Sequence, residues 1–157
     1  GLANRRAFFT LSEQYVKIAR RMKKRGCILF IDIDGMKRVN DGSGHGTGDR
    51  VLSELSGLLR EVFRESDIVA RLGGDEFAIL ALDIDGVSGE VLLDRLRSRL
   101  DVFNADRPAD LRISVSCGIR NFDPGEQASI EDLLRDADRL MYEEKKRKKA
   151  AAPPPRP

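Results

Sequence analysis

Tryptophan is absent from this 157-residue sequence, histidine and cysteine are rare, and aromatic residues make up only 6% of the chain. The two cysteines, Cys27 and Cys117, both lie inside apolar, strand-like segments. Such positions favour small buried hydrophobic side chains over a disulfide bridge. This cysteine usage fits a reducing, cytoplasmic compartment, for the chain alone or as the cytoplasmic part of a larger protein.

Long apolar segments and a strong net charge are also missing. No apolar run approaches the ~20 residues that cross a bilayer, and no signal peptide opens the sequence, so we expect no membrane partner for this segment. A formal net charge of +2 is too small to indicate nucleic acid as the main partner. A hydrophobic content of 41% and a charged content of 34% are typical of a globular chain, and the length predicts one domain.

The apolar patterns predict the element order helix, strand, helix, strand, strand, helix, strand, helix. Helices are expected to begin after Asn4, near Thr47, after Ser88 and after Ser129. The apolar face predicted for the first helix consists of Phe8, Leu11, Tyr15, Ile18, Ala19 and Met22. The expected strands cover residues 27–33, the two arms of a hairpin within 67–82, and 111–119. The last of these is predicted to be half-buried, with Ser116 and Gly118 on its polar face. This order predicts an α+β, ferredoxin-like fold, in which helices pack on a split βαβ sheet.

The composition changes after Tyr142, where a basic run is followed by alanine and proline. We expect the last helix to fray through the basic run and a stiff linker to follow it. The predicted domain is therefore 1–149, with a Pro-rich linker or tail at 150–157.

A predicted hairpin holds the most informative local pattern, because Gly73 and Gly74 lie between two apolar runs. Only glycine freely adopts the positive φ of a tight turn, so we predict a turn at this pair, directly followed by the carboxylates Asp75 and Glu76. The run 77–82 predicts a strand buried on both faces. Carboxylates at the start of such a buried strand indicate either a polar hairpin tip or a site for a divalent cation.

Two more carboxylates, Asp32 and Asp34, end the first predicted strand and lie on one side of it. If this strand neighbours the hairpin, three or four carboxylates meet at one edge, and their repulsion favours a bound proton or metal ion. Hard oxygen ligands with open positions suit Mg²⁺, which also takes substrate phosphates. Lys37 and the backbone N–H groups of the following loop form a suitable cradle for a triphosphate.

The loop 35–48 also offers groups for reading a nucleotide base. Asn40 and Asp49 supply hydrogen bonds to a base edge, and an aspartate accepting two N–H donors selects guanine over adenine. Asn40 also fits a plain turn and Asp49 a helix N-terminus, so both interpretations stay open. The loop lacks the Gly-Lys-Ser/Thr ending of a Walker loop, and we interpret His45 within it as a positioning residue.

The pentapeptide Gly73-Gly74-Asp75-Glu76-Phe77 resembles the motif that names the GGDEF family, the bacterial diguanylate cyclases. The resemblance extends over nearly the whole chain and implies a nucleotidyl-cyclase-like form of the α+β fold, with a central, mainly antiparallel sheet of about five strands flanked by helices. The opening residues resemble only the end of the family's first motif, which implies a fragment without its N-terminal sensor or regulatory domain. The other matching residues are Asp32-Ile33-Asp34, Lys37, Asn40-Asp41, Gly44-His45, Gly48-Asp49, Ser116-Cys117-Gly118, Ala137-Asp138, Tyr142 and Lys145.

The resemblance implies that two GTP molecules, one on each of two facing domains, are condensed to cyclic di-GMP with release of pyrophosphate. The catalytic form would therefore be a homodimer. Mg²⁺ or Mn²⁺, two ions per active half-site, would be held by Asp32, the Ile33 carbonyl, Asp75 and Glu76. Either Asp75 or Glu76 would take the hydroxyl proton, a choice that the sequence leaves open. Catalysis, in which Lys37 takes part, would rest on positioning and charge neutralisation.

The resemblance also implies a set of substrate contacts, with guanine read by two residues and the phosphates bound by lysines. Lys149 stands in for an arginine of the family, although lysine and arginine are not equivalent at a phosphate site. The basic run can equally be a solvated helix end. The implied substrate-binding residues are Asn40, His45, Asp49, Lys37, Arg71, Gly74, Lys145 and Lys149.

The segment 64–67 resembles the R-x-x-D motif of the family, which implies an inhibitory product site formed by Arg64 and Asp67, with Arg95 assisting. An ordinary ion pair at a helix end is the alternative. The intact pentapeptide favours an enzyme over a catalytically silent module that binds GTP or cyclic di-GMP. Asp49 argues against a cyclase that makes a mixed GMP-AMP dinucleotide.

Overall fold

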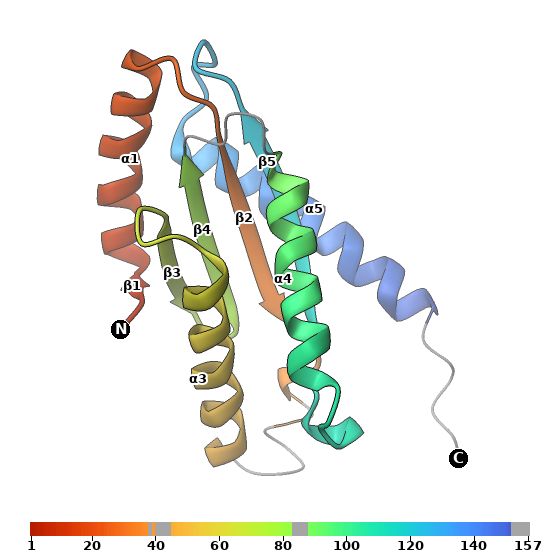
Figure 1. The fold of residues 1–157 in the computed structure, drawn as a ribbon. Helices are drawn as coiled ribbons and strands as arrows, with labels where there is room; N and C mark the ends of the chain where they lie inside the picture. Colours follow the sequence, from red (N-terminus) through yellow and green to blue (C-terminus); the bar gives the residue numbers. More distant parts are fainter. Residues whose placement is uncertain (38, 40–44, 83–87, 152–157) are drawn as a thin grey trace.

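The computed structural model describes residues 1–37, 39, 45–82 and 88–151 (Figure 1). It contains the predicted helices and strands in the predicted order, together with a two-residue first strand and a short 3-10 helix that the sequence did not indicate. The strands are β1 (Ala3–Asn4), β2 (Gly26–Ile33), β3 (Ile68–Gly73), β4 (Glu76–Leu82) and β5 (Val115–Phe122). The helices are α1 (Arg5–Arg21), α3 (His45–Val62), α4 (Gly89–Asn104), the 3-10 helix η1 (Ala109–Leu111) and α5 (Ile130–Ala151).

The five strands form one sheet in the order β1-β3-β4-β2-β5. β1 is parallel to β3, whereas the pairs β3–β4, β4–β2 and β2–β5 are antiparallel. The prediction of a mainly antiparallel sheet of about five strands is therefore confirmed, and the short β1 makes the sheet mixed. The central position of β2 explains its near-continuous apolar sequence, since all eight of its residues are buried.

Helices cover both faces of the sheet (Figure 1). Alternate residues of β2 belong to different core clusters, formed with different helices. Leu29 and Ile31 belong to the core cluster that includes the leucines of α3 and α4. Ile28 and Phe30 belong to the cluster formed with α1 and α5. Asp32 and Asp34 continue the even-numbered set, so the period of two directs them to the α1 and α5 side.

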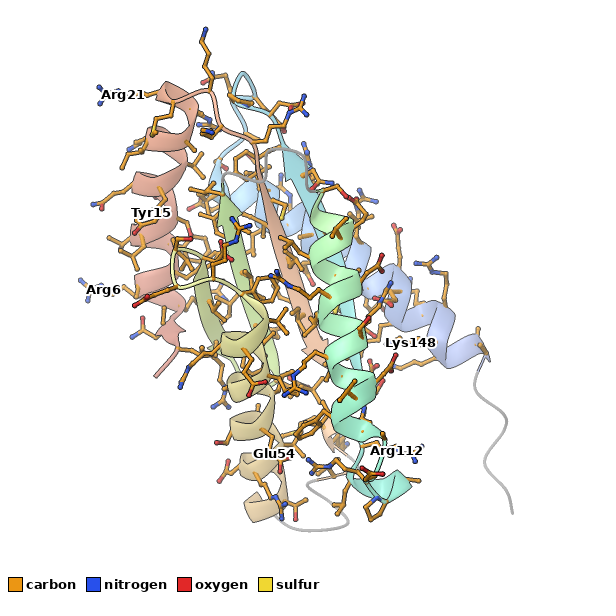
Figure 2. The ribbon with its side chains drawn as sticks, viewed as in Figure 1. Arg6, Tyr15, Arg21, Glu54, Arg112 and Lys148 are labelled. Atoms are coloured by element: carbon orange, nitrogen blue, oxygen red, sulfur yellow. The ribbon has the colours of Figure 1, made fainter. Side chains whose placement is uncertain are left out.

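Helix α1 begins as predicted, because the Asn4 side chain accepts a hydrogen bond of 2.9 Å from the Ala7 N–H. Its apolar stripe was only partly assigned correctly. Phe8 and Ala19 are buried, whereas Leu11, Tyr15, Ile18 and Met22 are 38–63% exposed. The sheet contacts the neighbouring stripe of Phe8, Ser12, Val16 and Ala19, whereas Tyr15, labelled on α1 in Figure 2, lies beside this stripe and stays partly exposed.

Strand β5 differs from its prediction, since it begins at Val115 rather than Leu111 and is not half-buried. Ser116 and Gly118, expected on a solvent face, are buried under α5. The approach is close enough that a Cβ at Gly118 would lie 1.9 Å from the Ala137 carbonyl oxygen. Only glycine permits this contact, so Gly118 decides how near α5 comes to the sheet.

Helix α5 starts with the predicted capping box, in which Ser129 Oγ accepts from the Asp132 N–H at 3.1 Å. The helix then continues to Ala151 instead of fraying after Tyr142. No helix within the described residues is both long and apolar enough to cross a membrane.

Candidate active site

The β3–β4 hairpin closes through a two-residue turn formed by Gly74 and Asp75, because Gly73 pairs with Glu76. Asp75 therefore lies in the turn rather than after it, which corrects the prediction of a Gly-Gly turn. Gly74 has φ 51°, a left-handed conformation that favours glycine. The Arg71 guanidinium donates two hydrogen bonds of 2.9 and 2.8 Å to the Gly74 carbonyl, which stabilises the turn.

The sheet brings the hairpin carboxylates to the end of β2, as predicted. Asp32 lies opposite Glu76 in the antiparallel register of β2 and β4. The Ile33 N–H donates to the backbone carbonyl of Asp75 at 3.2 Å, which fixes the turn beside the strand end. Residues more than forty positions apart in the sequence thus share one corner of the sheet.

The carboxylates at this corner destabilise one another's charge. The pKa of Asp32 is raised, mainly by burial and also by the charges of Asp75 and Asp34. Lys145 acts in the opposite direction and lowers it. The pKa of Glu76 is also raised, mainly by burial and then by Asp138, Asp32 and Asp75. Desolvated carboxylates that repel each other favour a bound cation.

Lys145 of α5 supplies a positive charge to this corner, since its ammonium group donates to Asp32 Oδ1. Although burial lowers the pKa of Lys145, its hydrogen bond and attraction to Asp32 raise it above the usual value. The ammonium therefore neutralises the aspartate that was predicted to hold a metal.

The donor set predicted for the metal consists of hard oxygens, from Asp32, the Ile33 carbonyl, Asp75 and Glu76, and this set suits Mg²⁺. The raised pKa values of Asp32 and Glu76 agree with a site that a cation would stabilise. Within residues 1–37, 39, 45–82 and 88–151, however, no three histidine, cysteine or acidic side chains are placed to share one ion. The oxygen atoms of these four residues therefore suit Mg²⁺ chemically, and their binding of a metal ion remains a prediction.

Asp34 lies only two residues from Asp32 but has a different environment. Ser116 Oγ donates to it at 2.6 Å, Ser114 Oγ at 2.7 Å and Lys148 Nζ at 3.0 Å. Burial raises the pKa of Asp34, but these hydrogen bonds outweigh burial and hold it below the usual range. Its charge is therefore satisfied within the protein.

The structure describes only part of the predicted nucleotide loop. Lys37 lies exposed after β2, and Asp49 is exposed in α3, just after its first turn. Asn40 and the side chain of His45 lie outside the described residues, so their predicted contacts stay predictions. Gly35 has φ 74°, a conformation that favours glycine at the end of β2.

The three residues predicted for product binding lie near one another on the side of α3 and α4. Asp67 accepts a hydrogen bond of 2.9 Å from the Arg64 N–H, and its own N–H donates to the Arg64 carbonyl at 2.9 Å. Burial raises the pKa of Asp67, while the charges of Arg64 and Arg95 act against this. Both arginine side chains are exposed, so the contact holding this turn is to the Arg64 backbone.

Three groups near the site were missed as candidates in the sequence, namely Lys148, Asp138 and Arg5. Lys148 reaches Asp34, while Asp138 and Arg5 act on the charge of Glu76. Every residue of the heptapeptide Glu143–Lys149 carries a charge, so nothing in this sequence distinguishes Lys148 from Lys149, the lysine that was predicted to contact a phosphate. Lys149 is exposed, and among the described residues it has no ion-pair partner.

A family model described as "Diguanylate cyclase, GGDEF domain" matches residues 1–151. The chain is a GGDEF domain. Among its relatives is the diguanylate cyclase DgcP of Pseudomonas aeruginosa, which is 37% identical over 145 residues, or 90% of this chain and 21% of that protein. The cyclic di-GMP phosphodiesterase NbdA of the same species is 34% identical over 143 residues, or 91% of this chain and 18% of that protein.

Solved structures agree with the fold of this GGDEF domain. The GGDEF domain of PA1120 (YfiN or TpbB) from Pseudomonas aeruginosa superposes with a TM-score of 0.80 at 34% identity, covering 94% of this chain and 92% of that one. The GGDEF domain of DgcB from Caulobacter crescentus, in complex with c-di-GMP, gives 0.80 at 28% identity, with 94% and 85% coverage. This GGDEF domain spans about a fifth of the length of the Pseudomonas relatives it matches.

Proposed function

We propose that this GGDEF domain is a diguanylate cyclase that condenses two GTP molecules into cyclic di-GMP across a homodimer. Each ribose 3′-hydroxyl attacks the α-phosphorus of the other GTP, forming two P–O bonds and releasing two pyrophosphates and two protons. The observation that carries the proposal is the register of Asp32 opposite Glu76, which places the carboxylates of the family pentapeptide at the end of β2. A relative named as a phosphodiesterase shows that membership of the family does not by itself establish synthesis.

Diguanylate cyclases of the GGDEF family are generally Mg²⁺-dependent, and we propose two ions per half-site here. Asp32, the Ile33 carbonyl, Asp75 and Glu76 would hold them, and the ions would neutralise charge on the reacting phosphates. Asp75 or Glu76 accepts the hydroxyl proton. Burial and the neighbouring carboxylates raise the pKa of Glu76, the direction in which a carboxylate becomes a stronger base.

The remaining predicted residues hold the substrate. Asn40 and Asp49 read the guanine edge, and Lys37, Lys145 and Lys149 contact phosphates. Lys145 already lies at the carboxylate corner, where it is 24% exposed and can meet a phosphate beside Asp32. Arg71 and Gly74 shape the hairpin on which the substrate rests, and His45 positions the loop.

One domain holds one reactant, so a second copy completes the active site. Bringing two bound nucleotides face to face converts a bimolecular encounter into a positioned reaction. A regulatory domain or partner would control this pairing, in the cytoplasm.

Arg64, Asp67 and Arg95 form a second site that binds the product and lowers activity. Exposed guanidinium groups beside a carboxylate suit a ligand that carries both phosphates and guanine edges. Changing Arg64 to Ala should raise the product inhibition constant about tenfold through loss of a charge-assisted contact. An unchanged inhibition constant, with intact basal turnover, would reject this assignment.

Incubation of the domain with GTP and Mg²⁺ tests the proposal directly, with and without fusion to a dimerising coiled coil. We expect slow formation of cyclic di-GMP by the domain alone and faster formation by the fusion, measured by chromatography of product and pyrophosphate. Binding of cyclic di-GMP without turnover in the fused form would instead indicate a catalytically silent receptor.

A further inference from the structure

The last turns of α5 have no apolar attachment to the rest of the domain. Met141 is the final buried residue of this helix, and Tyr142 is 54% exposed. None of the residues 142–151 is buried. A helix end without packing tends to fray, so other contacts must hold this segment where Lys145 reaches Asp32.

Glu144 provides the first such contact. Its Oε2 accepts a hydrogen bond of 2.6 Å from the backbone N–H of Cys117, in β5. Its Oε1 accepts one of 2.8 Å from Arg97 of α4, which links α5 to a second helix. The side chain of Glu144 is only 14% exposed, which makes this ion pair stronger than most surface pairs.

Lys148 provides the second contact, one helical turn further on (Figure 2). Its ammonium group donates to the Val115 carbonyl and, at 3.0 Å, to Asp34 Oδ2. β5 is an edge strand of the sheet, so Val115 and Cys117 present backbone groups that no other strand in the described part of the chain pairs. Glu144 accepts from the N–H and Lys148 donates to the C=O, and together they bind the open edge at two points.

Lys145 lies between these two anchors on the same turn of α5, and its ammonium group donates to Asp32. We propose that Glu144 and Lys148 are positioning residues, which form a clamp on the β5 edge that holds Lys145 ready to bind a substrate phosphate. The inference rests on the proposed function, in which Lys145 contacts GTP. The clamp itself touches neither substrate nor reacting atoms.

A clamp of this kind acts on substrate binding more than on the chemical step. Without Glu144, the helix end opens and Lys145 must be reordered each time a nucleotide binds. The expected result for Glu144→Ala is about tenfold weaker binding of a non-hydrolysable GTP analogue, a loss of the size of one charge-assisted hydrogen bond. KM should rise by a similar factor, with kcat changed less than threefold.

The test compares Glu144→Ala with Glu143→Ala, a matched control on the same helix. Glu143 is 53% exposed and pairs with Arg139 of its own helix, at 3.0 Å. Each variant is made alone and together with Lys145→Met. Calorimetry with the GTP analogue gives the affinity, and hydrogen–deuterium exchange over residues 142–151 reports fraying without reference to activity.

If the clamp positions Lys145, Glu144→Ala speeds exchange over 142–151 and weakens binding, whereas Glu143→Ala does neither. Glu144→Gln retains most of the affinity, because an amide oxygen still accepts from the Cys117 N–H. In the Lys145→Met background, Glu144→Ala adds no further loss. Arg97→Ala, which removes only the exposed ion-pair partner, gives a smaller change in the same direction and replaces Glu144→Ala should that variant fail to fold.

The proposal would be overturned if Glu144→Ala weakened binding of the GTP analogue equally with and without Lys145. It would also be overturned if Glu144→Ala speeded exchange over 142–151 but left the affinity for the analogue unchanged. If the unaltered domain does not bind the GTP analogue, the proposed function fails and the positioning role falls with it. Exchange over 142–151 would then still show whether Glu144 anchors the helix, so the two failures are distinguishable.

Discussion

Asp32 and Asp34 lie two residues apart at the end of β2, yet their surroundings have opposite effects. Asp32 meets one lysine and several carboxylates, and its pKa is raised. Asp34 receives hydrogen bonds from Ser114, Ser116 and Lys148, and its pKa is lowered. The comparison shows that hydrogen bonds joining β2, β5 and α5 stabilise the charge of Asp34, whereas burial and neighbouring carboxylates disfavour the charge of Asp32.

Changing Asp32 to Asn is expected to have the largest effect, because it should lower turnover strongly while leaving the unfolding free energy nearly unchanged. Loss of the charge should lower turnover at least about 100-fold, as for removal of a major electrostatic group in an active site. The unfolding free energy should change by less than about 1 kcal/mol, because the amide still accepts from a partly exposed lysine. Product chromatography and urea denaturation measure the two quantities.

Retention of turnover by this Asp32 variant would show that the carboxylate corner is not the reaction site. A large loss of stability would instead show that Asp32, like Asp34, is mainly structural.

The reverse result is expected for Asp34→Ala. Removal of a carboxylate that accepts three hydrogen bonds should lower the unfolding free energy by about 2–3 kcal/mol. Hydrogen–deuterium exchange at the end of α5 should also become faster, because Lys148 loses its hydrogen bond to Asp34. Urea denaturation gives the stability, with Asp101→Ala, an exposed change on α4, as a control. Stability equal to that of the unaltered domain would remove the contrast between the two aspartates.

A smaller change tests which contact of Asp34 matters most. Ser116 is fully buried, whereas Ser114 is exposed. Ser116→Ala should therefore cost about 1 kcal/mol and Ser114→Ala less than about 0.5 kcal/mol, as seen in thermal or urea unfolding. Equal effects would mean that burial does not decide the strength of these two hydrogen bonds.

The smallest effect concerns the two buried thiols. Burial raises the pKa of the Cys27 and Cys117 thiols to about 12. Both thiols stay protonated at pH 8, so we expect no labelling by a thiol reagent in the native state and two labels after unfolding. The raised pKa also means that stability present below the ordinary thiol pKa declines as the pH rises above about 9. Rapid native labelling at pH 8 would contradict the buried environment.

Much of the fold followed from local pattern. The Ser129 capping box, the Asn4 N-cap and the continuous apolar run of β2 each specified their element without reference to distant residues. The errors arose where a neighbour determined the burial. Ser116 was expected on a solvent face because the sequence does not show that α5 covers β5, and Tyr15 was expected in the core because the sheet contacts only part of the apolar face of α1.

The site shows the same division. The pentapeptide, Asp32 and Lys145 were identifiable as candidates because their residue types and spacing match a family motif. The role of Asp34 and the clamp at Glu144 and Lys148 were not, since a charged helix end contains many equivalent side chains. Which of them is buried depends on the angle and closeness of α5, and Gly118 sets that closeness.

The sequence by itself determined the element order, the turn chemistry at Gly74 and the residue types available to the site, because these depend on local conformation and periodicity. Only the tertiary structure decided that Asp32 lies opposite Glu76 and that Lys145 neutralises the charge of Asp32. It also decided that Asp34 accepts hydrogen bonds from two serines and a lysine. These depend on strand register and on the packing of α5, in which residues more than a hundred positions apart meet, and no local pattern encodes such distances.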